Sequence, residues 1–442
     1  MPVTHTWNVR LRDKSNLIDV DSKLLGFSLN QSVQIGRVAS YSGYMHLDNT
    51  NNTYTPDGGG THESLDWFSM LVEFKCQVND GSTTTIVDVA SMVVTDIDFQ
   101  DDGQQARVML TLYDYFSYAA RDQVKEIDAT VITDDLNVIA ETILNGNSDI
   151  ERVPFPKFGA GSNTVISINK KNNVPAGSVN AAGFWGIIDE FEDGTAKDVL
   201  NSQVLPAGPA IVYPTAATFA GSTFTLNAAY INRLMTKETV SGTDHYRVYE
   251  FTDTPTADKF PIQKISNQYN LVNTINQASV QAVYPVSGDG PYVSNNTSSQ
   301  NSIGVRSVTY SKVITWRFGG ATMADKAVIA DFWTNRFGDV TYTPQQLSVV
   351  LEAVDQQMDS SSRQNYADFL DVETCLWSIA EVTYTPTGGS SSKTYNCVIA
   401  GRQIFATPDH TTISLDLLPA ADYQSFTLNS ANLGILNENR LG

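Results

Sequence analysis

The sequence has 442 residues, of which 41% are apolar and 17% are charged. This composition excludes a disordered chain, and the length exceeds what one hydrophobic core holds, so we expect two to four domains. The net charge of −20 argues against a nucleic-acid-binding protein, because phosphate contacts require Lys and Arg. Residues 301–442 hold nine Lys and Arg against fourteen Asp and Glu, so most of the excess acid lies in residues 1–300.

Short runs that alternate apolar and polar residues recur along the chain and predict strands with one buried face. Two clear cases are residues 106–112 and residues 413–417. Residues 383–399 predict a hairpin, because two such runs flank the turn-forming segment 386–389. The predicted fold class is therefore mainly β, with β-barrel or sandwich domains and a few short helices.

Helix signals are few. Asp134 and Asp135 precede a periodic apolar stretch that ends before Gly146, which predicts a helix over about 134–145. A second helix is predicted over 322–337, where an apolar stripe ends before Gly338. We expect both to be short helices packed on β structure, the second against a C-terminal barrel.

Changes in composition divide the chain into three predicted regions. Residues 1–118 form an N-terminal β domain, and residues 119–300 form a middle region of mixed α and β structure. Residues 287–300 are rich in Gly, Ser and Asn and predict a linker. Residues 301–442 are then a separate C-terminal β-barrel domain.

The most acidic segment with a glycine is Asp96, Asp98, Asp101 and Asp102 before Gly103. Several carboxylates on a tight Gly-containing loop are typical of a calcium site. The spacing does not fit an EF-hand and no Glu closes the loop. An acidic hairpin turn is the favoured interpretation, and calcium is the alternative.

Residues 189–194 form a second acidic segment, with Glu190 and Glu192 spaced two residues apart. Paired carboxylates perform glycoside hydrolysis, but adjacent acids before a glycine more often form a solvated turn. We therefore favour a turn and keep wall degradation as an alternative.

Histidine and cysteine offer no further site. The five histidines (His5, His46, His62, His245 and His410) lack metal-binding spacing, and each is expected on the surface or in a strand. The three cysteines (Cys76, Cys375 and Cys397) show no C-x-x-C pattern, which excludes a zinc knuckle and a disulfide framework. Nucleophile-elbow and phosphate-loop motifs are also missing. The prediction is no catalytic, cofactor-binding or metal-binding residue, no cofactor, and no enzyme.

The N-terminal residues show no secretory signal, and no run of about 18 apolar residues predicts a membrane segment. We expect the chain to fold in a cytoplasm.

Three further segments carry patterns of one protein family. They are Gly36 with residues 44–50 and 54–56, residues 302–306 with 324–337 and 347–351, and residues 426–442. The first resembles a strand that ends in an Asn-containing turn before a Thr-Pro step. The second is similar to the entry into a C-terminal barrel, and the third to the tail of phage minor tail proteins. Together they resemble the hub proteins of the tail tip or baseplate of tailed phages, which also occur in gene transfer agents.

The resemblance implies a structural virion protein with tube-like β-barrels, present as a homotrimer around the tail axis. It implies contacts with the tail tube or distal tail protein on one side and with tip, spike or fibre proteins on the other. DNA would be a partner only in transit during ejection, and assembly would take place in the host cytoplasm. Residues 165–300 match no part of the family. The alternatives are a receptor- or carbohydrate-binding adhesin and a tail-associated wall-degrading enzyme, either of which could use that middle region.

Overall fold

The computed structural model describes the chain in segments. These are residues 2–13, 16–33, 39–56, 59–62, 65–67, 70–101, 103, 105–115, 117, 123–127, 130–134, 136–145, 150–152, 165–170, 184–188, 191–205, 210–214, 223–230, 235–254, 256–269, 271, 273–282, 290–313 and 322–420. The C-terminal stretch 426–442, on which part of the resemblance rests, lies outside the described residues.

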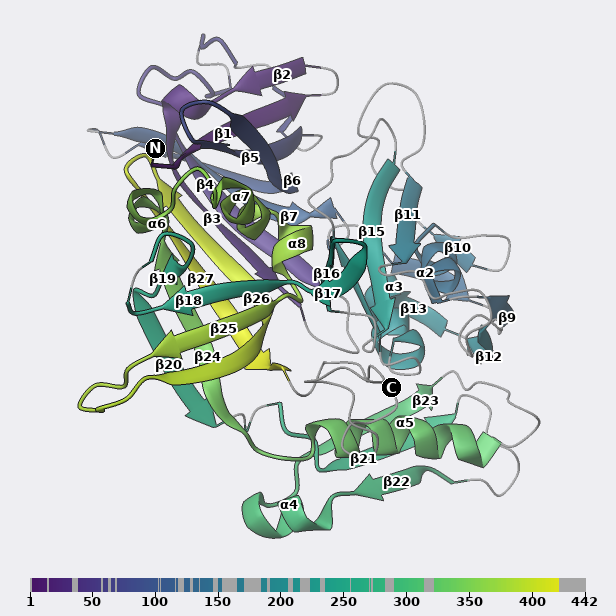
Figure 1. The fold of residues 1–442 in the computed structure, drawn as a ribbon. Coiled ribbons are helices and arrows are strands. Elements are labelled where there is room, and N and C mark those ends of the chain that lie inside the picture. The colour runs from purple at the N-terminus through teal and green to yellow at the C-terminus, as the bar shows by residue number, and fades with distance from the viewer. Residues whose placement is uncertain are drawn as a thin grey trace.

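One sheet of 14 strands combines both ends of the sequence (Figure 1). Its N-terminal strands are β1 (Thr4–Asp13), β2 (Asn16–Asp19), β3 (Leu24–Ser32), β4 (Ser40–Asp48), β5 (Met70–Asn79), β6 (Thr84–Asp101) and β7 (Ala106–Asp114). Their order across the sheet is β3-β4-β7-β6-β5-β1-β2, with every pair antiparallel. A short 3-10 helix, η1 (Asp21–Lys23), leads into β3. The strand predicted over 106–112 is confirmed as β7.

The other strands of this sheet curl into a barrel. They are β18 (Val248–Thr252), β19 (Phe260–Pro261), β20 (Lys264–Tyr269), β24 (Tyr342–Val350), β25 (Ile379–Tyr384), β26 (Lys393–Thr407) and β27 (His410–Pro419). Pairing runs β19-β18-β25-β26-β27-β24-β20, and β19 and β20 are consecutive, so the order returns to its start. The predicted hairpin is β25 and β26, and the mainly β fold class is confirmed.

Strand β26 joins the two parts of the sheet. Its residues from Gly401 to Ala406 pair antiparallel with Ser32 to Phe27 of β3. Arg402, which is fully buried, reinforces this junction: its Nε donates to Gln31 Oε1 at 2.6 Å and its guanidinium donates to the carbonyl of Phe369 at 3.0 Å. The N- and C-terminal regions therefore share one continuous sheet, and the domain boundaries at residues 118 and 300 stay a prediction.

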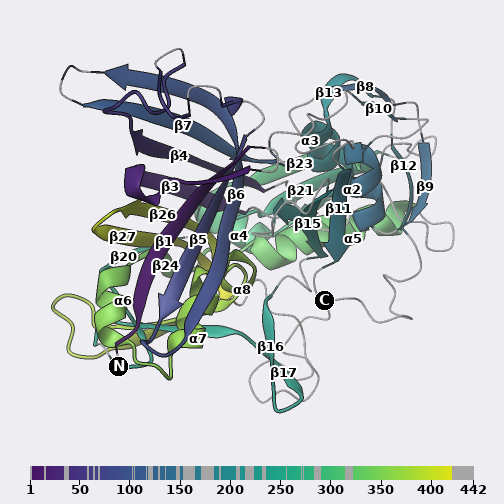
Figure 2. The same ribbon diagram turned by 90° about the horizontal axis from the view of Figure 1, so that it is seen from above.

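The middle of the chain forms smaller sheets on one side of the large one (Figures 1 and 2). Their strands are β8 (Gln123–Ile127), β9 (Thr130–Asp134), β10 (Ile150–Arg152), β11 (Val165–Lys170), β12 (Phe184–Ile188), β13 (Phe191–Thr195), β14 (Ala210–Pro214) and β15 (Thr223–Tyr230). They pair as β10-β8-β13, β11-β15-β14 and β12-β9. The helices are α2 (Leu136–Asn145), α3 (Ala196–Val199) and the π-helical turn η4 (Leu200–Val204). The first predicted helix is confirmed as α2.

A further lobe consists of β21 (Gln277–Ala282), β22 (Tyr292–Asn295), β23 (Ser307–Val313), α4 (Thr297–Ile303) and α5 (Thr322–Phe337). The bounds predicted for α5 are confirmed, but its expected place against the barrel is wrong. It packs on β21 and β22, where Thr334 Oγ1 lies 2.7 Å from Ser294 Oγ. The linker prediction is wrong over residues 290–300, which contain β22 and the start of α4, where Asn296 caps the helix by accepting from Ser299 N. Residues 287–289 lie outside the described residues.

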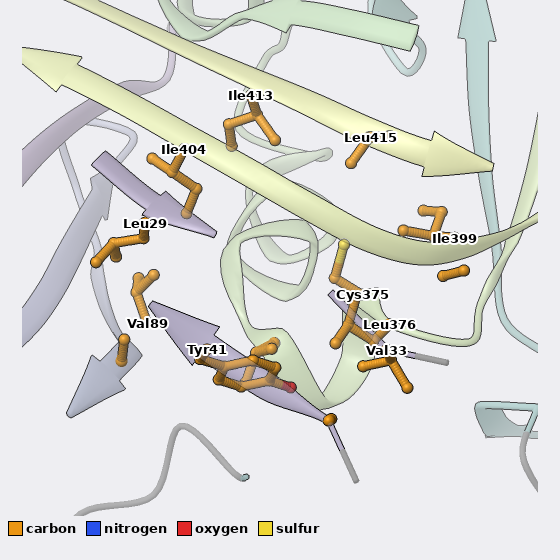
Figure 3. Close-up of a cluster of buried hydrophobic side chains, with 14 of the residues drawn as sticks. Leu29, Val33, Tyr41, Val89, Cys375, Leu376, Ile399, Ile404, Ile413 and Leu415 are labelled. Carbon is orange, nitrogen blue, oxygen red and sulfur yellow. The ribbon is translucent and has the colours of Figure 1, made fainter. Parts of the chain in front are cut away.

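Three helices cover the inner face of the large sheet and were missed in the sequence. They are α6 (Leu351–Gln357), α7 (Arg363–Leu370) and α8 (Val372–Cys375). Figure 3 shows the core beneath them, where Cys375 and Leu376 lie with Tyr41 of β4 and Leu29 of β3. All four side chains are at most 2% exposed. No helix in the described part of the chain is long and apolar enough to cross a membrane.

Candidate functional site

The outer face of the large sheet carries a row of polar side chains that crosses the junction. Cross-strand partners point to the same face, so the pairing register identifies the row. It runs Lys264, Ser348, Ser414, Gln403, Asn30 and Ser42, one residue each from β20, β24, β27, β26, β3 and β4. We call this surface the polar face. Alternation places the residues between these, such as Leu29, Ile404 and Leu415, in the core on the other side.

A second row lies beside the first and adds aromatic rings. It consists of Thr412, Phe405, Ser28, Tyr44 and Thr111, followed by Asp96 on β6. Phe405 is 42% exposed and Tyr44 is 39% exposed, whereas Ser28 between them is only 4% exposed. The polar face therefore offers amides, hydroxyls and two ring surfaces.

The polar face is hollowed where β26 and β27 meet β20, β24 and β3. The hollow has a volume of about 280 Å³, and its lining consists of Asn30, Lys264, Ser266, Gln346, Ser348, Gln403, Ser414 and Asp416. Ser348 Oγ and Ser414 Oγ are 3.0 Å apart, and Gln346 Nε2 donates to Asp416 Oδ1 at 3.5 Å. Burial raises the pKa of the Asp416 carboxyl. One lysine and one carboxyl are its charged groups, so the hollow is nearly neutral.

The first acidic segment lies at the β6 end of the polar face. Asp96 and Asp98 are exposed side chains within β6, and the turn itself falls between Asp101 and Ala106. Gly103 has a φ of +79°, and its N–H donates to Asp101 Oδ1 at 2.8 Å. The predicted acidic hairpin turn is confirmed at Asp101 and Gly103. The prediction is wrong for Asp96 and Asp98, which lie within β6 because this strand is longer than predicted. No cluster suited to a metal ion occurs among the described residues.

The second acidic segment falls partly on β13, which pairs antiparallel with β8. Asp189 and Glu190 lie outside the described residues. The interpretation as a turn is wrong for residues 191–194, which form β13, and stays a prediction for Asp189 and Glu190.

A buried polar cluster was not anticipated. His5 of β1 lies between α6 and β27, and its side chain is 8% exposed. Its Nδ1 is 2.8 Å from Asp355 Oδ2 and its Nε2 is 3.3 Å from Thr411 Oγ1. The hydroxyl of Tyr366 donates to Asp355 Oδ1 at 3.0 Å. The expectation that each histidine lies on the surface or in a strand is met by His5, which is in β1. The contact with Asp355 was not expected, because α6, which carries Asp355, was not predicted.

This cluster links an acid (Asp355), a base (His5) and a hydroxyl (Thr411) in that order, but its surroundings do not suit catalysis. Thr411 is 1% exposed, so a substrate could not reach its hydroxyl. The same Oγ1 accepts a hydrogen bond from Trp7 Nε1 at 3.0 Å. The cluster therefore joins β1 to α6 and β27.

The other histidines lie on different elements. Burial and the nearby Arg107 lower the pKa of His46 on β4. His62 stacks on Tyr54 with a centroid distance of 5.7 Å. His245 is on strand β17 (Thr243–Tyr246), and His410 lies 3.3 Å from Glu352.

The three cysteines are buried free thiols. Burial raises the pKa of Cys76 and Cys375, and it raises the pKa of Cys397 to about 12. A thiol that stays protonated is a poor nucleophile and a poor metal ligand, so these residues pack as small apolar groups.

Comparison with known proteins gives matches in structure only. No protein-family model matches the chain, and no curated protein does either. The tail protein from Neisseria meningitidis MC58 is 11% identical, with 94% of this chain and 98% of that chain covered and a TM-score of 0.52. A 43 kDa tail protein of prophage MuSo2 from Shewanella oneidensis is 10% identical, with 94% and 100% covered and a TM-score of 0.49. Prophage tail protein gp18 from Listeria monocytogenes is 10% identical, with 92% and 94% covered and a TM-score of 0.41.

The chain therefore has the fold of the tail protein from Neisseria meningitidis over 94% of its length. The family resemblance stated from the sequence is confirmed at the level of fold. The polar face was missed in the sequence. Alternation indicates which residues of a strand share a side, but it does not indicate which strands are neighbours.

Proposed function

We propose that this chain is the central hub of a phage tail tip or baseplate, a structural protein that joins the tail tube to the distal tip or spike. The observation that carries the proposal is the polar face, which continues without interruption from the barrel into the N-terminal strands. A protein that surrounds a passage needs one extended, solvent-facing surface of uniform character, and this face spans β20 to β6.

In the proposed hub, three copies surround the tail axis and the polar face of each forms the wall of a DNA channel. The wall is amide- and hydroxyl-rich at its centre, and Asp96 and Asp98 add negative charge at one end. Phosphates find few cations on such a surface and are repelled by its carboxylates, so DNA passes without binding. We assign no catalytic activity to the chain, and we place it in the tail of the virion.

The test is charge addition on the polar face. Asn30, Gln346 and Gln403 are exposed there, and replacing all three by Lys should give the assembled ring affinity for duplex DNA at low salt and slow genome ejection. The matched control places three lysines at Ser298, Asn301 and Ser302, which are exposed on α4 and outside the polar face.

DNA binding and genome ejection, measured together, test whether the polar face lines the channel. The unchanged ring should show no affinity for DNA, and only the polar-face variant should gain it. Equal effects of the two triple variants would contradict the proposal that the polar face forms the channel wall. A reconstruction of the particle with one copy or six copies on the axis, or with copies at the periphery as fibres, would contradict the hub itself.

A further inference from the structure

The loop between α4 and β23 presents an apolar and a basic side chain next to each other. Val305 is 58% exposed, and Arg306 is exposed as well. Arg306 forms no ion pair with any described residue. Both residues belong to segment 302–306, which carries part of the family resemblance and has no role in the channel wall. We call residues 304–306 the lobe loop.

The lobe loop is held firmly from beneath by one buried side chain. Asn276 is fully buried, and its Nδ2 donates to the carbonyl of Gly304 at 2.9 Å. Its Oδ1 accepts from the N–H of Arg306 at 2.7 Å, and the N–H of Asn276 donates to the carbonyl of Arg306 at 3.0 Å. A loop held in this way loses little conformational entropy when it binds a partner.

The lobe that carries this loop differs in charge from the rest of the chain. Residues 277–337 hold five Lys and Arg against three Asp and no Glu, although the whole chain has a net charge of −20. The excess of acid therefore lies entirely outside the lobe. A basic surface favours contact with an acidic one, and a second copy of this chain supplies it.

A hollow that suits these two side chains lies between β6 and the helices α7 and α8. Its volume is about 350 Å³, and Asp88, Asp368, Asp371 and Glu373 contribute carboxyl groups to its lining. Ile86 also lines it and is 61% exposed. The hollow therefore offers an apolar side chain beside carboxylates, as the lobe loop offers an apolar side chain beside a guanidinium. We call this hollow the acidic pocket.

The carboxylates of the acidic pocket outnumber the cations paired with them. Lys75 lies 2.7 Å from Asp88. Arg247 lies 2.5 Å from Asp368, but Glu238 of β16 (Lys237–Val240) shares the same guanidinium at 3.2 Å. The pocket therefore keeps a net negative charge on the single chain.

Asp371 shows the effect of this charge. Burial raises the pKa of its carboxyl, and the neighbouring carboxylates of Asp368 and Asp88 add to the rise. The hydrogen bond from Glu373 N, at 2.9 Å, and the buried Arg402 oppose it. A further cation in the pocket would reduce the repulsion among these carboxylates.

The lobe loop cannot reach the acidic pocket of its own copy, because Figure 1 shows α4 and β23 well separated from α7. We propose that the lobe loop of one copy docks in the acidic pocket of the next copy, with Arg306 among the carboxylates and Val305 against Ile86. A contact between two different surfaces repeats head to tail, and it closes into a ring when three copies surround an axis. The inference rests on the proposed homotrimer.

The test measures self-association of the full chain by sedimentation velocity and native mass spectrometry. Arg306→Glu and Asp88→Arg each bring like charges together and should weaken association at least about tenfold. The double variant with both substitutions restores opposite charges and should recover most of the lost affinity. Association of the unchanged chain should also weaken between about 0.1 M and about 1 M salt, because the Debye length falls from about 10 Å to about 3 Å.

The matched controls reverse charges outside the contact. Lys393→Glu on β26 and Asp409→Arg in the turn before β27 both change exposed side chains, and both variants should associate like the unchanged chain. Thermal unfolding of every variant shows whether a substitution harms the fold. The double variant still tests the contact where a single variant is less stable.

The outcomes separate this contact from the hub. Trimers that are equally stable in all variants, or a chain that stays monomeric at all concentrations, overturn the loop contact and leave the hub to the copy number in the particle. Weaker association in Asp88→Arg but not in Arg306→Glu means that another segment fills the acidic pocket, which also overturns the proposal. Association that the charge swap restores but that does not stop at three copies supports the loop contact and overturns the trimer.

Discussion

Asp114, at the end of β7, is a carboxyl group that folding removes from water. It is 2% exposed, and its oxygens accept from Tyr41 N and Ser117 N at 2.6 Å each and from Ser117 Oγ at 2.5 Å. Burial raises the pKa of Asp114 to about 6, although these hydrogen bonds favour the charged form.

A folded-state pKa above the unfolded value means that the native state binds the proton more tightly. The contribution of Asp114 to the free energy of unfolding is therefore fully present below about pH 4 and is lost as the pH rises to about 6. This contribution to the free energy of unfolding is at most about 3 kcal/mol. Urea unfolding from pH 4 to pH 7 should show this fall in the wild type and not in Asp114→Asn. Parallel pH profiles would contradict the prediction.

Gly43 of β4 permits the close approach of β3. A Cβ atom on residue 43 would lie 2.4 Å from the carbonyl oxygen of Ser28 and 3.0 Å from a methyl carbon of Leu29. Gly43→Ala should therefore push the two strands apart and lower the free energy of unfolding by about 2–3 kcal/mol. Gly290→Ala is the control, because a Cβ there meets no atom within 4 Å. Equal stability of the two variants in urea would show that β3 and β4 adjust freely.

At the scale of elements, α6 holds the first strand in place through the cluster around His5. Asp355→Ala would leave the His5 ring and the Tyr366 hydroxyl without their shared acceptor in a buried site. A buried polar group that loses its partner costs about 1–3 kcal/mol, so the variant should unfold at lower urea concentration. Gln356→Ala, on the exposed side of the same helix, should unfold with the wild type. A loss of stability in both variants would point to the helix and not to the cluster.

The elements differ in how well the sequence indicates them. The strand β7 alternates cleanly, and α5 combines a periodic stripe with a terminal glycine, so both were predicted with nearly correct bounds. By contrast, α6 follows β24 directly at Val350 without a side-chain cap, and Ser362 before α7 makes no capping bond. Helices without caps depend on tertiary packing of one buried face, which a single sequence does not display.

At the scale of the whole molecule, the barrel draws its strands from two of the predicted regions. Strands β18, β19 and β20 lie before residue 301, and they pair with β25 and β24 after it. A fragment of residues 235–442 keeps these partners, whereas a fragment of residues 301–442 lacks them. The longer fragment should show a cooperative thermal transition at higher temperature than the shorter one. Equal transitions in calorimetry would support a separate unit over residues 301–442.

The polar face illustrates why a surface of this kind is invisible in the sequence. Its central residues, Asn30 and Gln403, are ordinary polar positions of two alternating strands. Only the pairing of β3 with β26 makes them neighbours. Composition did indicate the acidic, mainly β character of the molecule, but the assignment of particular side chains to one wall required the strand order.

The pairing of β3 with β26 also has a consequence for the synthesis of the chain on the ribosome. Gln31 and Arg402, which bind each other at this junction, are separated by 371 positions. At about 5–20 residues per second, the partner strand emerges roughly 20–75 s after β3. During this interval one hydrogen-bonding edge of β3 stays uncovered, which is a common starting point for aggregation. A trigger factor or other chaperone that binds nascent chains should therefore raise the soluble yield of the full-length chain.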